Sequence, residues 1–362
     1  MKYSYNDIMI VPATISYISS RSQCNPYTTY NYLPIFTAPM ASVVSEDNYN
    51  VFQENKIYPI IPRNIPFLSR LNLLNSGVWC AFSLSEAESL YGYELNDNSK
   101  ILIDIANGHM KKLYDIAKEL KSKCKTYQVM VGNIANPNTY EYVSRNYYEY
   151  VDYIRVGIGG GNGCITSSNT GIHYPIASLI KECKQIKDTI GGPKIIADGG
   201  IRNYSDIIKA LALGADYVMV GSLFAQCIES AGDKYSMNQL NKIDMRFNYN
   251  AWEEDSLRIN ENGEWFGHIK ELKDEKYIGQ LNVKFFGMAS ADGQKSILGE
   301  KSKTSEGITK WLPVKYNLSS WRENMEDYLK SAMSYLNVKD LSGLSKAEIV
   351  IISDNTKNSI NK

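Results

Sequence analysis

Short, continuously apolar segments alternate with longer amphipathic ones through the first two thirds of this chain. Eight of these segments are strand-like: 34–39, 58–62, 77–82, 101–106, 127–133, 153–158, 194–200 and 217–222. Several are rich in β-branched residues at successive positions, which is typical of parallel strands buried on both faces. The intervening stretches, such as 109–123 and 203–214, carry apolar residues at helical spacing, and Gly214 is the signal at which the second of these helices should end. This alternation predicts an α/β fold.

Polar and glycine-rich residues gather at the points where the strand-like segments end. They are Asn64, Asp104, Asn107, Asn133, the stretch 157–164, Asp198 to Gly200, and Gly221 with Ser222. A (β/α)8 barrel, or TIM barrel, places its chemistry at the carboxyl ends of its strands. Eight β-then-α units therefore fit such a barrel, although a doubly wound open sheet has the same local pattern.

Two stretches do not follow this repeat. Residues 233–283 are polar and contain an Asn-Gly pair that favours a hairpin turn, so we expect an insertion after the eighth βα unit that projects over the barrel as a possible lid. Residues 289–310 are polar and glycine-bearing, which predicts a mobile loop or flap. We expect a closing helix over 319–336, followed by a strand-like tail, EIVIIS.

The charge balance and the cysteines exclude several classes of protein. The chain has 39 Lys+Arg and 39 Asp+Glu, unlike a protein that binds nucleic acid through a broad basic face. Its six cysteines lie far apart without a C-x-x-C pair, so a zinc site is not expected and a reducing compartment is. No apolar run is long enough to span a membrane, and the start lacks a secretory signal. We expect a soluble, cytoplasmic protein that binds neither nucleic acid nor membrane.

The densest signal is the stretch GIGGGNGCIT at 157–166, which follows a predicted strand. Five glycines in seven positions let the backbone approach a ligand closely, so that its amides can cradle a phosphate or its carbonyls can bind a cation. Cys164 stands at the end of this loop, where a thiol would be exposed to a ligand. The alternative is a tight turn with an incidental thiol.

Two further strand ends carry small residues ahead of a helix. Asp198-Gly199-Gly200 follows the seventh strand and Gly221-Ser222 follows the eighth. The loops after these two strands form the phosphate site of many (β/α)8 barrels, and an aspartate beside them can bind ribose hydroxyls. Either motif alone would be an ordinary turn. Together with the glycine-rich loop they predict a site for a nucleotide monophosphate.

These motifs resemble the IMP dehydrogenase and GMP reductase family along nearly the whole chain. The resemblance rests on YSYNDIMIVPA, APM, VGIGGGNGCIT, ADGGIRNYSDIIKALALGADYVMVGS, FFGMAS, SEG and IVIIS. It implies one catalytic (β/α)8 barrel domain over 1–362, a purine nucleotide substrate, a nicotinamide cofactor and a cysteine thiolate that attacks purine C2. It also implies a homotetramer. No pair of regulatory CBS domains interrupts the barrel.

The resemblance also implies roles for individual residues. Cys164 matches the nucleophile, Thr166 its hydroxyl partner and Glu306 a proton shuttle. Substrate binding is implied for Met40, Asn162, Asp198, Gly199, Gly200, Gly221, Ser222, Gly287 and Met288; cofactor binding for Asp104, Ala106, Asn107 and Asn133; and ligation of a monovalent cation such as K+ by the carbonyls of Gly159, Gly161 and Cys164.

Three features resemble the reductases within the family. The segment 104–108 reads D-I-A-N-G, similar to their D-V-A-N-G, and 166–175 keeps the spacing T-x-x-x-T-G-x-x-Y-P. Neither Arg nor Tyr occurs between Gly287 and Glu306, so the Arg-Tyr pair with which dehydrogenases activate water is absent from that segment. The resemblance therefore implies NADPH-dependent reductive deamination of GMP to IMP.

Some positions depart from the family pattern. Asn162 replaces a serine that usually binds phosphate, Phe285-Phe286 leaves no tyrosine before Gly287, and Arg155 is the choice of dehydrogenases. A deoxynucleotide such as dGMP or a modified guanine nucleotide therefore remains open as the substrate. Two alternatives also stay open: an IMP dehydrogenase that uses NAD and lacks regulatory domains, and a catalytically silent barrel that binds a purine nucleotide.

Overall fold

The central feature of the fold is one sheet of eight parallel strands, seen in a computed structural model that describes residues 2–161, 165–236, 242–243, 258–259, 265–266, 278–279, 281–300, 304–354 and 356–357. The strands run in the order β2-β9-β8-β7-β6-β5-β4-β3. They are β2 (Ile35–Thr37), β3 (Ile60–Ile61), β4 (Trp79–Phe82), β5 (Lys100–Asp104), β6 (Gln128–Ile134), β7 (Tyr153–Val156), β8 (Lys194–Asp198) and β9 (Tyr217–Val220). All eight predicted strands are therefore present.

The sheet curls into a nearly closed barrel. Its two edge strands meet where Thr37 N donates to Tyr58 O at 2.9 Å and Tyr58 N donates to Ile35 O at 3.0 Å. Closure of this kind removes the exposed strand edges. The open sheet left possible by the sequence pattern is therefore excluded.

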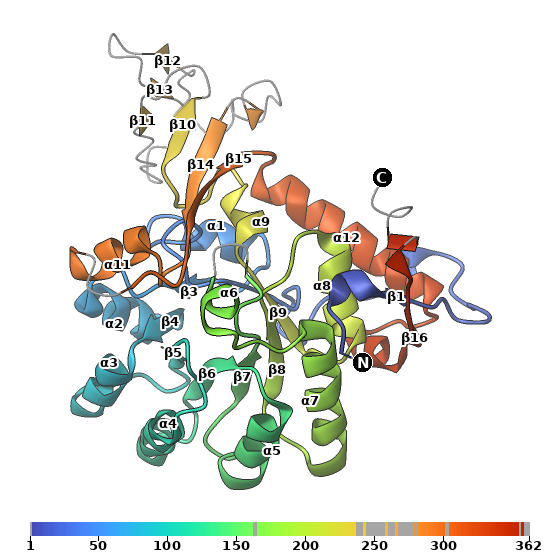
Figure 1. The fold of residues 1–362 in the computed structure, drawn as a ribbon, viewed down its shortest axis with the longest axis horizontal. Helices are drawn as coiled ribbons and strands as arrows, with labels where there is room; N and C mark the ends of the chain where they lie inside the picture. The colour runs from blue at the N-terminus through green and yellow to red at the C-terminus, as the bar shows by residue number, and fades with distance from the viewer. Residues whose placement is uncertain are drawn as a thin grey trace.

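Helices surround the barrel (Figure 1). They are α1 (Tyr49–Glu54), α2 (Phe67–Asn75), α3 (Leu84–Ser89), α4 (Lys111–Lys123), α5 (Pro137–Asn146), α7 (Ile176–Ile190) and α8 (Tyr204–Ala212), with the short α6 (Thr166–Thr170) and α9 (Ser222–Ala225) at strand ends. The sequence pattern missed α2, because its apolar residues are not confined to one face: Leu71 and Leu74 are buried, whereas Leu68 is exposed. The predicted end of α8 is confirmed, since Gly214 follows it with a φ of 107°.

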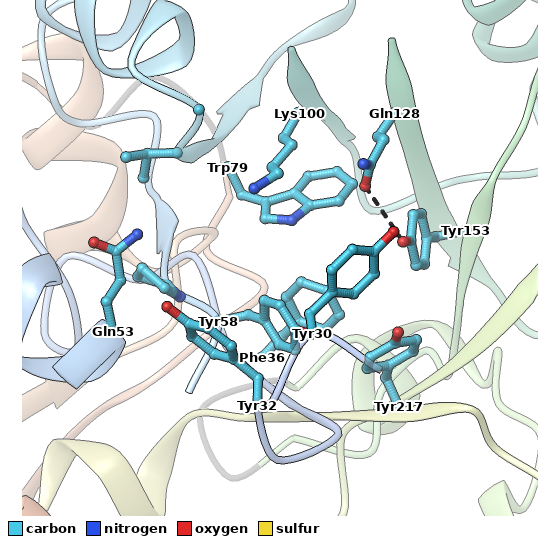
Figure 2. Close-up of a pocket in the computed structure, with 13 residues that line it drawn as sticks. Tyr30, Tyr32, Phe36, Gln53, Tyr58, Trp79, Lys100, Gln128, Tyr153 and Tyr217 are labelled. Carbon is cyan, nitrogen blue, oxygen red and sulfur yellow. Dashed lines mark hydrogen bonds between the residues drawn. The ribbon is translucent and has the colours of Figure 1, made fainter. Parts of the chain in front are cut away.

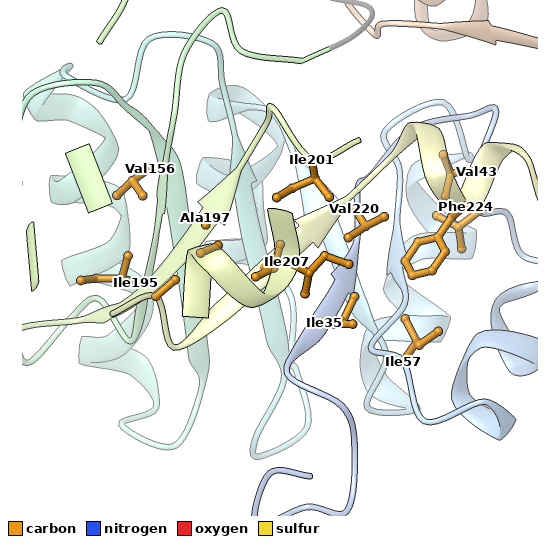
Figure 3. Packing of buried hydrophobic residues seen from close by; sticks show 14 of the residues in the cluster. Ile35, Val43, Ile57, Val156, Ile195, Ala197, Ile201, Ile207, Val220 and Phe224 are labelled. Carbon is orange, nitrogen blue, oxygen red and sulfur yellow. The ribbon is translucent and has the colours of Figure 1, made fainter. Parts of the chain in front are cut away.

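Apolar side chains fill two layers on opposite faces of the strands. In β8, Ile195 and Ala197 point outward to the helices, whereas Ile196 points into the barrel. Figure 3 shows the outer layer, in which Ile207 of α8 packs among side chains from several strands. Burial on both faces explains why the strands are apolar at successive positions.

Further strands and helices lie outside the barrel. One sheet has the order β11 (Lys242–Ile243), β10 (Lys234–Ser236), β14 (Leu281–Phe286), β15 (Thr309–Pro313), and a separate pair joins β12 (Arg258–Ile259) to β13 (Trp265–Phe266). The chain also forms α12 (Leu318–Tyr335) and pairs β1 (Ile8–Ile10) with β16 (Ile349–Ile351); the 3-10 turns are Tyr5–Asp7, Arg21–Gln23, Leu90–Gly92 and Leu341–Lys346. The predicted closing helix and terminal strand are thus confirmed, and Figure 1 places the β10–β14–β15 strands above the barrel.

The segment 289–310, predicted as a mobile loop or flap, contains a helix. Residues Ala291–Leu298 form α11, which begins where the Ser290 side chain accepts a hydrogen bond from Gly293 N at 3.0 Å. It ends at Gly299, whose φ is 78°. Local capping at both ends, rather than apolar spacing, therefore defines this helix. Among the described helices, none has the length and apolar character needed to cross a membrane.

Arg70 on α2 is a buried cation that joins three neighbouring segments. Its side chain is 2% exposed; Nε donates to Ile65 O at 2.8 Å, Nη1 donates to Ala81 O at 2.5 Å, and the guanidinium pairs with Glu86. Because its removal leaves the carbonyls of Ile65 and Ala81 without this donor and Glu86 without its cation, we expect Arg70→Met to lower the free energy of unfolding by about 3 kcal/mol or more in urea denaturation.

The control is Arg145→Met, which removes an exposed arginine paired with Glu141 one helical turn away. This change should cost less than about 0.5 kcal/mol. Equal losses for the two variants would contradict a structural role for the Arg70 contacts.

Candidate active site

A cavity of about 220 Å³ lies at the carboxyl ends of the barrel strands. Eleven of the residues predicted from sequence line it: Met40, Asp104, Gly161, Asp198, Gly199, Gly200, Gly221, Ser222, Gly287, Met288 and Glu306. They lie up to 266 positions apart in the sequence, from Met40 to Glu306. The structure therefore brings these eleven residues together around one cavity.

Some predicted residues fall elsewhere. Cys164 and Asn162 lie outside the described residues. Ala106, Asn107, Asn133 and Thr166 are not in the lining of this cavity, but Asn133 and Thr166 hydrogen-bond residues that are.

Arg155 joins two aspartates at the floor of the cavity. Its Nη1 donates to Asp104 Oδ1 at 2.5 Å, and its Nη2 and Nε donate to Asp198 Oδ2 at 2.7 and 3.1 Å. Arg63 adds a second cation, with Nε 3.3 Å from Asp104 Oδ2. Arg155 is buried, with 8% of its side chain exposed, whereas Asp104 and Asp198 are partly exposed, at 13% and 16%.

Sequence reasoning named Arg155 only as a departure from the reductase pattern and did not foresee this network. The available signal was an arginine inside the otherwise apolar strand segment YIRV. A buried arginine requires carboxylate partners. Asp198 ends the neighbouring strand β8, and Asp104 ends β5, which is two strands away from β7.

The network shifts the pKa values of Asp104 and Arg155. Burial by itself would raise the pKa of Asp104, but the positive charges and hydrogen bonds of Arg155 and Arg63 hold that pKa below its usual value. Burial would lower the pKa of Arg155, and the two aspartates instead raise it. The floor of the cavity therefore carries an ionised Asp104 and a charged Arg155 guanidinium at neutral pH.

Asn133 connects the network to the glycine-rich loop. Its Nδ2 donates to Asp198 Oδ2 at 2.6 Å and to Gly157 O at 2.8 Å, while its backbone carbonyl accepts from Gly108 N at 2.8 Å. Asn107 is used locally, because its Oδ1 accepts from His109 N at 3.2 Å. Asn133 thus positions the Asp198 carboxylate as well as the start of the loop.

A hydroxyl and a carboxylate meet at the rim of the cavity. Thr166 Oγ1 donates to Glu306 Oε2 at 2.9 Å, and Ile165 N donates to Glu306 O at 2.9 Å. Glu306 N in turn donates to Ala289 O at 3.1 Å. The segment after the glycine-rich loop is therefore held against the segment Ser305–Gly307, which is 140 residues away in the sequence.

Glycines shape the opposite wall. Gly199 and Gly200 have φ values of 94° and 78°, and a Cβ at Gly199 would lie 3.2 Å from Gly161 N. A Cβ at Gly221 would lie 3.2 Å from the sulfur of Met40. Side chains at these positions would fill the space that a ligand needs, as expected for loops that let backbone amides approach a phosphate.

The carbonyl groups of the glycine-rich loop are partly used within the chain. Gly159 O accepts from Ser167 Oγ at 3.1 Å, and Ile158 O lies 2.8 Å from His173 Nδ1. A carbonyl oxygen has a second lone pair, so Gly159 keeps the capacity to bind a cation. Among the described residues, no group of three or more His, Cys, Asp or Glu side chains could hold a metal ion.

Comparisons with known proteins agree with this site. Residues 93–245 match the model of the IMP dehydrogenase / GMP reductase domain. The chain is 31% identical to a protein named GMP reductase from Streptococcus pyogenes serotype M4 (strain MGAS10750), over 99% of this chain and 96% of that protein. It is 28% identical to a GMP reductase from Staphylococcus carnosus (strain TM300), over 98% of both chains.

The chain belongs to the IMP dehydrogenase / GMP reductase family. This family consists of NAD(P)-dependent oxidoreductases of purine nucleotides. The resemblance predicted from the sequence motifs is therefore confirmed. In the structure of this family member, the matching motifs after β7, β8 and β9 face one cavity.

Gly157, the first residue of the glycine-rich loop, offers a direct test of how tightly this site is built. Its φ is 132°, and a Cβ there would overlap the carbonyl oxygen of Asp198. We expect Gly157→Ala to lower the free energy of unfolding by about 3 kcal/mol, because it combines backbone strain with a clash that displaces a neighbouring strand end. Chemical denaturation measures this change.

Gly160→Ala, three residues further on, is the matched control. Its Cβ would meet no heavy atom closer than 3.6 Å, and its φ lies outside the left-handed range. We expect a loss below about 1 kcal/mol. A loss as large as that of Gly157→Ala would refute the packing argument.

Proposed function

We propose that this chain catalyses the NADPH-dependent reductive deamination of GMP, or of a related guanine nucleotide such as dGMP, to IMP. The observation that carries the proposal is the hydrogen bond between Thr166 Oγ1 and Glu306 Oε2 at 2.9 Å. A hydroxyl coupled to a carboxylate at the rim of a cavity can accept and return protons. Such a pair suits the departure of ammonia from the purine.

Cys164 is the proposed nucleophile. The residue that follows it, Ile165, is hydrogen-bonded to Glu306, so the chain immediately after the thiol is anchored at the cavity rim. Burial raises the pKa of the thiols of Cys80, Cys183 and Cys227, which lie in the core and so have the inert character of structural cysteines.

The proposed chemistry proceeds through a covalent adduct. The Cys164 thiolate forms a bond to C2 of the guanine, and the C2–N2 bond breaks as the amino group takes protons through Glu306 and Thr166 and leaves as ammonia. NADPH, when bound, would supply a hydride to C2, and breakage of the C–S bond would then release IMP and regenerate the Cys164 thiolate. The segment 289–310 would exclude water, which would otherwise convert the adduct to XMP.

Asp198 is the proposed ribose ligand. Within the described part of the chain, its three hydrogen bonds all go to Oδ2, from Arg155 and Asn133. Oδ1 is thereby oriented but left for ribose hydroxyls. Backbone amides of Gly199, Gly200, Gly221 and Ser222 would hold the phosphate, together with Asn162, while Met40 and Met288 would pack on the base.

The residues near Asp104 fit the nicotinamide end of the cofactor. Asn64 Oδ1 is buried and has no hydrogen-bond partner among the described residues, so a carboxamide N–H would satisfy it. Asp104, Ala106, Asn107 and Asn133 complete the proposed set. We also propose K+ at the carbonyls of the glycine-rich loop, a homotetramer, and one domain with an insertion at 233–283, most of which lies outside the described residues.

An assay of the purified chain tests the proposal. GMP, dGMP, IMP and XMP are each incubated with NADPH or NAD, and the absorbance of reduced nicotinamide and the release of ammonia are followed. We expect NADPH to be consumed with GMP or dGMP, with one ammonia released per nicotinamide oxidised. NAD reduction with IMP and no turnover of GMP would overturn the proposal in favour of a dehydrogenase, and binding of GMP without any turnover would favour a silent barrel.

Glu306→Gln tests the proton shuttle. The variant keeps the size of the side chain but loses the carboxylate, so GMP should still bind while ammonia release slows by about 10²-fold or more. Binding is measured by calorimetry and turnover by ammonia release. Glu300→Gln removes an exposed carboxylate from the same segment and should leave both unchanged. Unaltered turnover in Glu306→Gln would remove this residue from the mechanism.

A further inference from the structure

A second cavity lies at the opposite end of the barrel from the candidate active site. Its volume is about 260 Å³, and it is lined by residues at which strands begin, including Trp79, Lys100, Gln128, Tyr153 and Tyr217. The two cavities therefore occupy the two ends of the same strands: β5 starts at Lys100 in one and ends at Asp104 in the other.

Aromatic rings form most of the wall of this second cavity, which we call the amino-end pocket. Phe36 stacks on Tyr58 with 4.9 Å between ring centroids, and Trp79 meets Tyr153 edge-on at 5.3 Å. Figure 2 shows these rings grouped around the pocket, with Tyr30 lying across it. Flat π-faces and edges on several sides suit a planar ligand better than a flexible or branched one.

The segment that carries Tyr30 and Tyr32 is held in place before any ligand arrives. Thr28 N donates to Tyr32 O at 2.8 Å, and Asn31 has the left-handed φ of 60° that closes this turn. The Thr28 hydroxyl lies 2.9 Å from the hydroxyl of Tyr58. A wall fixed in this way loses little conformational entropy on binding.

The charge of the pocket is positive. Lys100 is partly buried, and its ammonium has neither a hydrogen bond nor an ion pair with the residues that the structure describes. The ammonium of Lys194 lies at the rim, 5.3 Å from the ring centroid of Tyr153. The nearby carboxylates form ion pairs with other lysines: Asp152 pairs with Lys121, and Asp216 pairs with Lys187. An unpaired ammonium beside aromatic walls attracts an anion and repels a cation.

We propose that the amino-end pocket binds a planar aromatic anion, a one- or two-ring molecule that carries a carboxylate or similar acidic group. Its ring would lie among Tyr30, Trp79 and Tyr217, and its anionic group would pair with Lys100, with the Gln128 side chain beside it. The volume is close to the lower end for ligand sites, about 300 Å³, which excludes a whole dinucleotide. This site is independent of the function proposed above.

The test uses 2-naphthoate, with neutral 2-naphthalenemethanol and cationic 2-naphthylmethylammonium as matched probes, and isothermal titration calorimetry of the full chain. We expect 2-naphthoate to bind at least tenfold more tightly than either analogue. Equal affinity for the three probes, tighter binding of the cation, or no binding of the anion would overturn the proposal.

Variants locate the site. Lys100→Met removes the charge and should weaken 2-naphthoate at least tenfold, whereas Lys118→Met, at an exposed lysine near Tyr150 outside the pocket, should have no effect. Tyr30→Ala should also weaken binding, and it cannot unfold the barrel because Tyr30 is 64% exposed.

Glu306→Gln, at the other end of the barrel, should bind 2-naphthoate like the parent chain. Loss of binding in this variant, or unchanged binding in both Lys100→Met and Tyr30→Ala, would place the probe elsewhere and overturn the proposal.

Discussion

The interaction on which the carboxyl end of the barrel depends is the bridge that Arg155 makes between Asp104 and Asp198. It joins the ends of β5 and β8 through a side chain that projects from β7. A guanidinium that is 8% exposed is stable only if carboxylates compensate its charge, and the two aspartates in turn depend on this cation, together with Arg63 beside Asp104. Loss of any one of the three would leave an uncompensated charge within the barrel.

The bridge also controls what the site can do. Because Arg155 and Asn133 both bind Oδ2 of Asp198, the carboxylate has one orientation, and Asn133 transmits this orientation to the glycine-rich loop through Gly157 O. The backbone beside Asp198 tolerates no side chain at Gly157, because a Cβ there would overlap the carbonyl oxygen of Asp198. A nucleotide would therefore meet a preorganised surface, which limits the entropy lost on binding.

Much of the fold could be predicted from local sequence. The elements that the prediction missed were missed for physical reasons. The eight strands were predictable because burial on both faces requires successive apolar residues, and Gly214 marked the end of α8. The helices α2 and α11 were missed, because the first has apolar residues on both faces and the second is defined by caps. Residues lining the candidate active-site cavity were predictable from motifs, but the partners of Arg155 were not, because ion pairing depends on the order of the strands in the sheet.

The sequence by itself determined the family, the αβ alternation and the positions of the glycines and polar residues at strand ends, because each of these depends only on residue type and spacing along the chain. Only the tertiary structure decided that the sheet closes into a barrel, that Thr166 meets Glu306, and that Arg155 meets two aspartates. It also decided that aromatic residues from several strand starts form one pocket with an unpaired Lys100. These contacts join residues far apart in the sequence, and their distances are set by strand order and register rather than by local composition.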